Sequence, residues 1–232
     1  ESVRALAHRR QPRVGLAHLR IAGRFLVSTK PVAHQSIAVT SSYIGSVART
    51  LNVLLQAGTD NDGRFELRHL LPGFYKVAHI FHDARLNTTR FGQSAVVEVR
   101  PGETAHVTLG GAGRPVIGRV VVAARGEAVS LNGYQHRLES KLPALDTPKL
   151  DDENARAVWV NKYLIPRMKM ERSYPVMIAA DGSFRIEDVL PGTYILTIQS
   201  SDGTKLTQEV VIPEMPEARS DEPLNLGTIT IR

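Results

Sequence analysis

The stretch that decides the fold reads Asn61-Asp62-Gly63-Arg64-Phe65-Glu66-Leu67-Arg68-His69-Leu70-Leu71-Pro72-Gly73-Phe74-Tyr75-Lys76-Val77. It decides the fold because the chain contains a second version of it. That version reads Ala180-Asp181-Gly182-Ser183-Phe184-Arg185-Ile186-Glu187-Asp188-Val189-Leu190-Pro191-Gly192-Thr193-Tyr194-Ile195-Leu196. Seven residues recur at one spacing of 119 positions, as from 62 to 181: Asp62, Gly63, Phe65, Leu71, Pro72, Gly73 and Tyr75 return as Asp181, Gly182, Phe184, Leu190, Pro191, Gly192 and Tyr194. The sequence therefore predicts an internal structural repeat.

The repeated stretch predicts two strands joined to their neighbours by tight turns. Asp-Gly favours a hairpin turn, because glycine accepts a positive φ and aspartate tolerates the left-handed region. Phe65 and Leu67 then alternate with polar residues, which indicates a strand with one buried face, and the second version repeats the alternation. Leu-Pro-Gly predicts a type II turn. A further strand follows, in which Tyr75 or Tyr194 should point inward.

Other short apolar segments, separated by turn signals, frame each version of the stretch. Around the first version they are 19–27, 36–39, 51–55, 95–99 and 106–109, and around the second they are 116–122, 208–212 and 226–231. Many short strands at close spacing are typical of β-sandwiches. The sequence therefore predicts an all-β protein of two tandem antiparallel β-sandwich domains of the prealbumin or immunoglobulin-like kind.

The run Asp-Gly-x-Phe followed by Leu-Pro-Gly-x-Tyr resembles the signature of carboxypeptidase regulatory-like domains. These domains belong with the transthyretin-like and Cna B-type sandwiches, which are also grouped under a carbohydrate-binding-like fold. The segments around Gly23 and Gly118 fit the family's first strand, and Leu226-Gly227-Thr228-Ile229 fits its last. The resemblance covers roughly residues 17–110 and 113–232. It implies a fold and assigns no activity, because the matching residues are turn and core residues.

The repeat also predicts the domain boundaries. They are a basic leader at 1–16, a first sandwich at 17–110, a glycine-rich linker at 111–115 and a second sandwich at 116–232. We expect the three glycines at 110–113 to form a flexible hinge that is short enough for the domains to touch. Gly118 and Gly182 lie about 24 positions further apart than Gly23 and Gly63, which places an insertion at about 132–170 of the second domain.

This insertion carries the sequence signals of a short helix. Three acidic residues at 151–153 precede apolar residues at helical spacing, namely Ala155, Val158 and Trp159. Pro166 should end the helix, because proline removes a backbone hydrogen bond and clashes with the preceding turn. We expect this apolar face to pack on the sheet of its own domain.

The histidines offer three candidate sites, each with a simpler structural interpretation. His136-x-x-Glu139 resembles part of a zinc site, but no histidine follows it to supply a third ligand. His79 and His82 are three apart on one strand and should point to opposite faces. His82-Asp83 could act as a base with its orienting acid, although neither repeat offers a recognisable nucleophile.

Three other patterns are equally incomplete. Asp60-x-Asp62 provides only half of a calcium loop. Asn87-Thr88-Thr89 is a glycosylation sequon, a short pattern that also occurs by chance. Lys30 and Asn225 are a poor match to the buried lysine–asparagine cross-link of some Cna B-type domains. We therefore predict no catalytic residues, no metal and no cofactor, and the sequence identifies no binding residues.

Charge and composition narrow the partners. The net charge is +6, and residues 1–30 contain seven Lys and Arg against one acid, Glu1. This leader could contact phosphate or anionic lipid, but no aromatic residues lie between its arginines to stack bases, so nucleic acid is not an expected partner. The chain has no cysteine, which excludes disulfides and thiolate chemistry. No apolar run reaches the roughly 20 residues of a membrane helix.

These features favour a non-catalytic binding or spacer module of a larger bacterial protein in the cell envelope or outside the cell, cut from a longer precursor. Its partners would be neighbouring domains of the same polypeptide, with polysaccharide or protein as ligand. The alternative is an accessory domain of an enzyme, a peptidase or a thioredoxin-like redox protein, whose catalytic domain lies outside this chain. A third hypothesis, a hydrolase that uses His82 and Asp83, requires a pocket joining them to a nucleophile.

Overall fold

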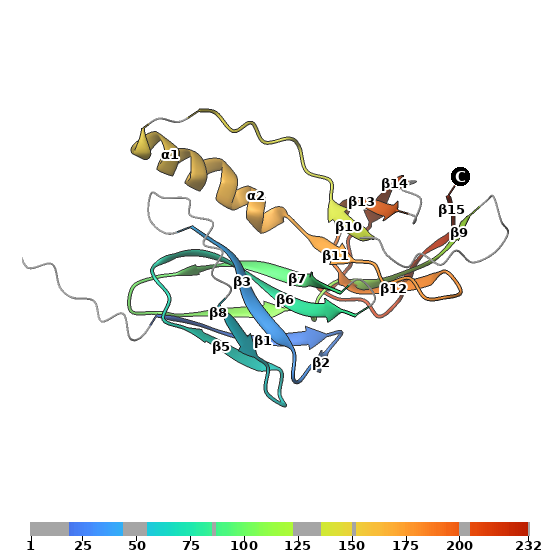
Figure 1. Cartoon of the computed structure of the whole chain (residues 1–232), viewed down its shortest axis with the longest axis horizontal. Helices are drawn as coiled ribbons and strands as arrows, with labels where there is room; N and C mark the ends of the chain where they lie inside the picture. Colours follow the sequence, from blue (N-terminus) through green and yellow to red (C-terminus); the bar gives the residue numbers. More distant parts are fainter. Residues whose placement is uncertain are drawn as a thin grey trace, which may run out of the picture.

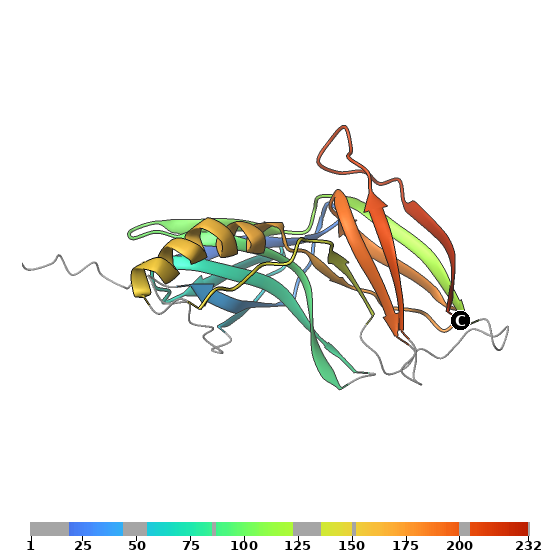
Figure 2. The same ribbon diagram turned by 90° about the horizontal axis from the view of Figure 1, so that it is seen from above.

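The computed structural model describes residues 19–43, 55–84, 87–122, 136–149, 152–199 and 205–231. These residues form two β-sandwiches that follow one another along the long axis of the molecule, with one helical segment (Figures 1 and 2). The all-β prediction is confirmed. The predicted basic leader at 1–16 lies outside the described residues.

The first sandwich contains two sheets. In one, β1 lies antiparallel to β5 and parallel to β8, and the short β2 pairs with its end; in the other, the order is β4-β3-β6-β7. The strands are β1 (Arg20–Val27), β2 (Lys30–Pro31), β3 (Ser36–Tyr43), β4 (Gln56–Gly58), β5 (Arg64–Arg68), β6 (Gly73–Asp83), β7 (Thr88–Val99) and β8 (Thr104–Leu109).

The second sandwich has the same strand order. β9 lies antiparallel to β12 and parallel to β15, and the other sheet has the order β11-β10-β13-β14. The strands are β9 (Arg114–Val122), β10 (Arg137–Ser140), β11 (Ser173–Pro175), β12 (Ser183–Val189), β13 (Gly192–Gln199), β14 (Lys205–Ile212) and β15 (Leu224–Ile231).

The predicted start of the insertion at 132 is wrong, because β10 is an inner strand of the sheet and the chain leaves the sandwich only after Ser140.

A phenylalanine ring crosses over a strand glycine in both sandwiches. Phe65 pairs with Gly23 and Phe184 pairs with Gly118, and both rings are buried. A Cβ atom on Gly23 would lie 2.3 Å from the Phe65 ring, and one on Gly118 would lie 2.6 Å from the Phe184 ring. The glycines therefore leave the space that each ring fills. Each ring belongs to a separate hydrophobic cluster, one in each sandwich.

The two turns of the repeated stretch differ in how far they follow the prediction. Gly63 and Gly182 have positive φ values of 70° and 83°, as the Asp-Gly turn requires. The prediction of a type II turn at Leu-Pro-Gly is wrong. That turn needs φ near +80° at glycine, whereas Gly73 has φ 157°. The left-handed residues are instead His69 and Asp188, with φ 61° and 57°.

The tyrosine of each stretch holds this second corner. The Tyr75 hydroxyl donates to the Leu71 carbonyl (2.6 Å) and accepts from the Leu71 N–H (3.1 Å). The Tyr194 hydroxyl likewise donates to the Leu190 carbonyl (2.8 Å). Such tyrosine corners satisfy backbone groups where the chain passes between sheets. The spacing Leu-Pro-Gly-x-Tyr therefore reflects a hydrogen bond from the tyrosine to the leucine as well as a turn.

The helical segment continues through Pro166, contrary to the prediction. It consists of α1 (Glu153–Trp159), a π-helical turn (Val160–Leu164) and α2 (Ile165–Met170). In the π turn the Ile165 N–H bonds to the Val160 carbonyl, five residues back. We attribute the passage of proline to this wider turn, which moves the preceding carbonyls away from the ring.

The helical segment packs on the first sandwich, which overturns the prediction that it covers its own sheet. It lies over the sheet that contains β6 and β7 (Figures 1 and 2). Glu171 forms an ion pair with Lys76 (2.8 Å), and the Lys169 ammonium lies 5.5 Å from the centroid of the Phe74 ring. The buried helical residues are Val160, Ile165 and Met168. Val158, which was predicted to lie on the buried face, is 64% exposed, so the predicted face is also wrong.

Candidate functional site

The linker between the sandwiches is a tight corner, at which three glycines lie against neighbouring backbone. Gly110, Gly111 and Gly113 have φ values of 74°, 77° and 93°. A Cβ atom on Gly110 would lie 2.0 Å from the Leu26 carbonyl oxygen, and one on Gly113 would lie 2.5 Å from that of Val189. These glycines therefore serve close packing of backbone on backbone. The predicted linker end at 115 is also too late, because β9 already begins at Arg114.

Asp188 forms hydrogen bonds that stabilise this corner. Its carboxylate accepts hydrogen bonds from the backbone N–H groups of Ser28 (2.9 Å) and Gly111 (3.0 Å) and from the Arg219 guanidinium (3.2 Å). The side chain is buried, and burial raises the pKa of the carboxyl above its usual range, although the two N–H groups and Arg219 act in the opposite direction. The carboxylate thus joins the β1–β2 turn, the linker and the second sandwich.

Arg90 is a second polar contact between the sandwiches. From β7 its guanidinium donates to Asp83 of β6 (3.1 Å) and, across the joint, to the His136 carbonyl (2.8 Å) and the Met177 sulfur (3.2 Å). Arg90 and Asp83 are both buried. Because a buried ion pair is stable only when its remaining hydrogen bonds are made, this contact depends on the second sandwich being in place.

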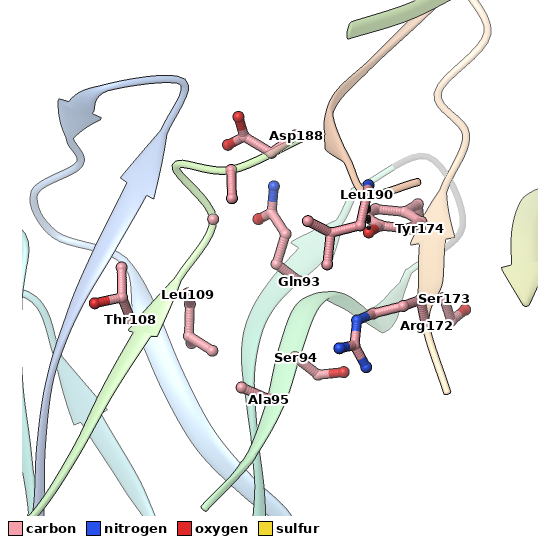
Figure 3. A pocket seen from close by; sticks show the side chains of 12 residues that line it. Gln93, Ser94, Ala95, Thr108, Leu109, Arg172, Ser173, Tyr174, Asp188 and Leu190 are labelled. Atoms are coloured by element: carbon pink, nitrogen blue, oxygen red, sulfur yellow. Dashed lines mark hydrogen bonds between the residues drawn. The ribbon is translucent and has the colours of Figure 1, made fainter. Parts of the chain in front are cut away.

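A cavity of about 160 Å³ lies where the sandwiches meet (Figure 3). It is lined by β7, the end of β8 and the linker on one side and by β11 and the end of β12 on the other. The polar side chains in its wall are those of Gln93, Ser94, Thr108, Arg172, Ser173, Tyr174 and Asp188. It brings residues of both sandwiches together, and we take it as the candidate site.

Arg172 provides the cation of this cavity. Its backbone N–H bonds to the Ser140 hydroxyl (2.8 Å), and its Nη1 donates to the carbonyls of Lys169 (2.5 Å) and Glu171 (3.0 Å). These contacts anchor the side chain at the junction of the helical segment and β11. Figure 3 shows its guanidinium directed toward Ser94 of the first sandwich.

The histidine candidates from the sequence are engaged in packing. His79 stacks on Phe25 with ring centroids 4.5 Å apart, its Nε2 lies 3.1 Å from the Gln35 amide oxygen, and burial lowers its pKa. His136 is buried, and its Nδ1 accepts from the Gln199 N–H (3.2 Å).

The dyad of His82 and Asp83 does not form. His82 is exposed, whereas the adjacent Asp83 is buried against Arg90, so the two side chains point to opposite faces of β6. The hydrolase hypothesis has no support from this geometry.

The remaining candidates have local roles. Asp60 accepts from the N–H groups of Asp62 (2.9 Å) and Arg64 (2.8 Å), which closes the hairpin turn. Lys30 and Asn225 are exposed on different sandwiches, so they cannot be the cross-linked pair. Within the described ranges, the acids and histidines form no cluster of three that could hold a metal ion, and no helix there is long and apolar enough to cross a membrane.

Comparison with known proteins yields only distant similarities. No family profile and no curated protein matches the chain. Among solved structures, the minor pilin GBS52 of Streptococcus agalactiae has 9% identity and a TM-score of 0.33, covering 91% of this chain and 94% of the pilin. The Bacillus anthracis TIE protein has 14% identity and a TM-score of 0.28, covering 93% of this chain and 34% of its own length.

A streptococcal ancillary pilin has 15% identity and a TM-score of 0.25, covering 92% of this chain and 62% of the pilin. All three TM-scores lie below 0.5, so these similarities support no conclusion about activity.

The sequence did not reveal Asp188, Arg90 or Arg172. The only available signal was that Asp188 stands where the first version of the repeat has His69.

Proposed function

We propose that the chain is a non-catalytic, two-domain binding and spacer unit of a larger bacterial protein in the cell envelope or outside the cell. Its domains, with boundaries near 17–110 and 114–232, would be of the carboxypeptidase regulatory-like kind within the transthyretin-like and Cna B-type sandwiches. The resemblance of the Asp-Gly-x-Phe and Leu-Pro-Gly-x-Tyr motifs supports this assignment. The unit would hold a neighbouring domain, or a polysaccharide or protein ligand, at a fixed distance and orientation.

The buried polar joint is the observation that carries this proposal. Asp188 and Arg90 each bind groups of both sandwiches, and the linker glycines adopt conformations that other residues rarely take. Ordinary interfaces between domains of one chain permit relative motion. Buried charges whose partners lie across the interface oppose that motion, because separation would leave them unpaired.

Distance measurements between spin labels test the rigidity directly. The chain has no cysteine, so Glu103→Cys and Gln208→Cys introduce one labelling site on each sandwich at exposed positions. We expect a single narrow distribution of distances in double electron–electron resonance. Asp188→Asn should broaden it, whereas His69→Asn, the matched change in the first sandwich, should leave it unchanged.

A broad distribution in the otherwise unaltered chain would overturn the rigid spacer. Sequencing the open reading frame on both sides separates this proposal from the accessory-domain alternative. A catalytic peptidase or thioredoxin-like domain next to the chain would favour the alternative.

A further inference from the structure

We infer that the cavity between the sandwiches binds a small sugar acid, with Arg172 contacting its carboxylate. The inference deepens the proposed function, on which it rests, by naming a ligand class for the joint. The cavity, a cation in its wall that has no acid partner among the described residues, and hydroxyl and amide groups that bond to none of those residues support it independently of any distant relative.

The guanidinium of Arg172 presents the donor geometry that a carboxylate requires. An arginine has five N–H donors in a planar fork. The Nη1 group is occupied by the carbonyls of Lys169 and Glu171, which leaves the Nε–H and Nη2–H donors on the other edge. That edge matches the two oxygens of a carboxylate in a side-on pair of parallel hydrogen bonds.

This charge has no acid partner within the part of the chain that the structure describes. The hydrogen bonds of the Arg172 side chain there are to backbone carbonyls, and Glu171 pairs with Lys76 instead. The other charged residue of the wall, Asp188, already binds Ser28, Gly111 and Arg219. Figure 3 shows its carboxylate directed away from Arg172. The cavity therefore favours an anion.

The rest of the lining suits a hydroxylated ligand. The side chains of Gln93, Ser94, Thr108 and Ser173 have no hydrogen-bond partner among the described residues, and they come from both sandwiches. Hydroxyl and amide groups of this kind can bind sugar hydroxyls as donors and acceptors. A volume of about 160 Å³ is small beside the roughly 300–1,000 Å³ of pockets for drug-sized molecules, so it suits one small ring.

Isothermal titration calorimetry with D-glucuronate, at low salt and with the full chain, tests the site. We expect saturable binding of D-glucuronate and none of D-glucose, its uncharged counterpart. Arg172→Gln should weaken binding by at least about tenfold, because it leaves the carboxylate without its charged partner. Arg185→Gln is the matched control on an exposed ion pair of β12 and should bind as the unaltered chain does.

Two further variants keep the result interpretable. Arg172→Lys retains the charge without the fork, so it should bind more weakly than the unaltered chain and more tightly than Arg172→Gln. Gln93→Ala removes an amide from the opposite wall and should weaken binding even if Arg172→Gln fails to fold.

Lack of glucuronate binding by the unaltered chain, or binding that Arg172→Gln does not change, would overturn the site. Saturable binding of the peptide Gly-Gly-Ala in place of glucuronate would overturn the sugar-acid assignment. None of these outcomes would alter the spin-label distances, so failure of the site and failure of the rigid spacer are distinguishable.

Discussion

The two sandwiches differ most instructively at one matched position. His69, just after β5, and Asp188, next to the end of β12, occupy matching positions of the repeated stretch, and both adopt the left-handed region, with φ 61° and 57°. His69 is exposed, whereas Asp188 is buried and accepts hydrogen bonds from Ser28 and Gly111. The same backbone corner is thus a surface turn in one sandwich and part of the joint in the other. A side-chain difference on a common fold thus adds a polar contact between two domains.

The edge strands show the same asymmetry. In the first sandwich β7 is the edge of its sheet, and Arg90 and the cavity residues place it against the second sandwich. In the second sandwich the matching strand, β14, is also an edge and has Val211 62% exposed. Exposed edges tend to carry charges that prevent unwanted pairing, and Lys205 and Glu209 provide them here.

The largest effect should come from the buried rings that the sandwiches share. Phe65→Ala and Phe184→Ala should each lower the free energy of unfolding by about 3–5 kcal/mol, because each leaves a cavity above a strand glycine. Denaturant melts measure the loss. Phe91→Ala, at a half-exposed ring, is the control and should cost less. A small effect at both buried rings would contradict the strand orientation, and a large difference between them would break the equivalence of the sandwiches.

The matched pair Asp188→Asn and His69→Asn should separate the joint from the fold. Asparagine tolerates the left-handed region, so both changes preserve the backbone. Asp188→Asn should cost about 1–3 kcal/mol through weaker hydrogen bonds to Ser28, Gly111 and Arg219, whereas His69→Asn should stay within about 0.5 kcal/mol. Equal losses of unfolding free energy in thermal or denaturant melts would show that stability depends on the backbone corner and not on the buried charge of Asp188.

Strand positions could be predicted from the sequence because the relevant signal is local. Alternation around Phe65 and the spacing of turn residues predicted β5, β6 and their matches, and the burial of both rings. The joint could not be predicted in this way. Asp188 binds Ser28 across 160 positions, and β10 has only four residues, whose place in the sheet depends on its neighbours.

The helical segment illustrates the same limit. Its apolar spacing predicted a helix, but the buried side is set by the first sandwich, from which Phe74 and Lys76 contact it. The candidate cavity likewise exists only because two domains meet, so no single stretch of sequence encodes it.

A smaller effect should appear in the pH dependence of the joint. Burial raises the pKa of Asp188, and repulsion from Glu187 raises it further. Arg219 and the N–H groups of Ser28 and Gly111 lower it, but by less. A carboxyl with a raised pKa in the folded state contributes stability below its unfolded pKa and loses it as pH rises through the folded pKa. The difference in unfolding free energy between the unaltered chain and Asp188→Asn should therefore shrink with rising pH above the usual aspartate range. A growing difference would mean that the three donors outweigh burial and lower this pKa.

The smallest effect should come from the exposed ion pair at the joint, which tests whether every contact between the sandwiches matters. Lys76 and Glu171 lie 2.8 Å apart, but both are accessible to solvent. Because exposed pairs contribute only about 0–1 kcal/mol, Glu171→Gln should change the melting curve slightly, and less at high salt. The pair of Lys141 with Glu209, within the second sandwich, is the control, and Glu209→Gln should behave alike. If Glu171→Gln instead broadened the spin-label distances as Asp188→Asn is expected to, the helical segment, rather than the buried corner, would hold the sandwiches together.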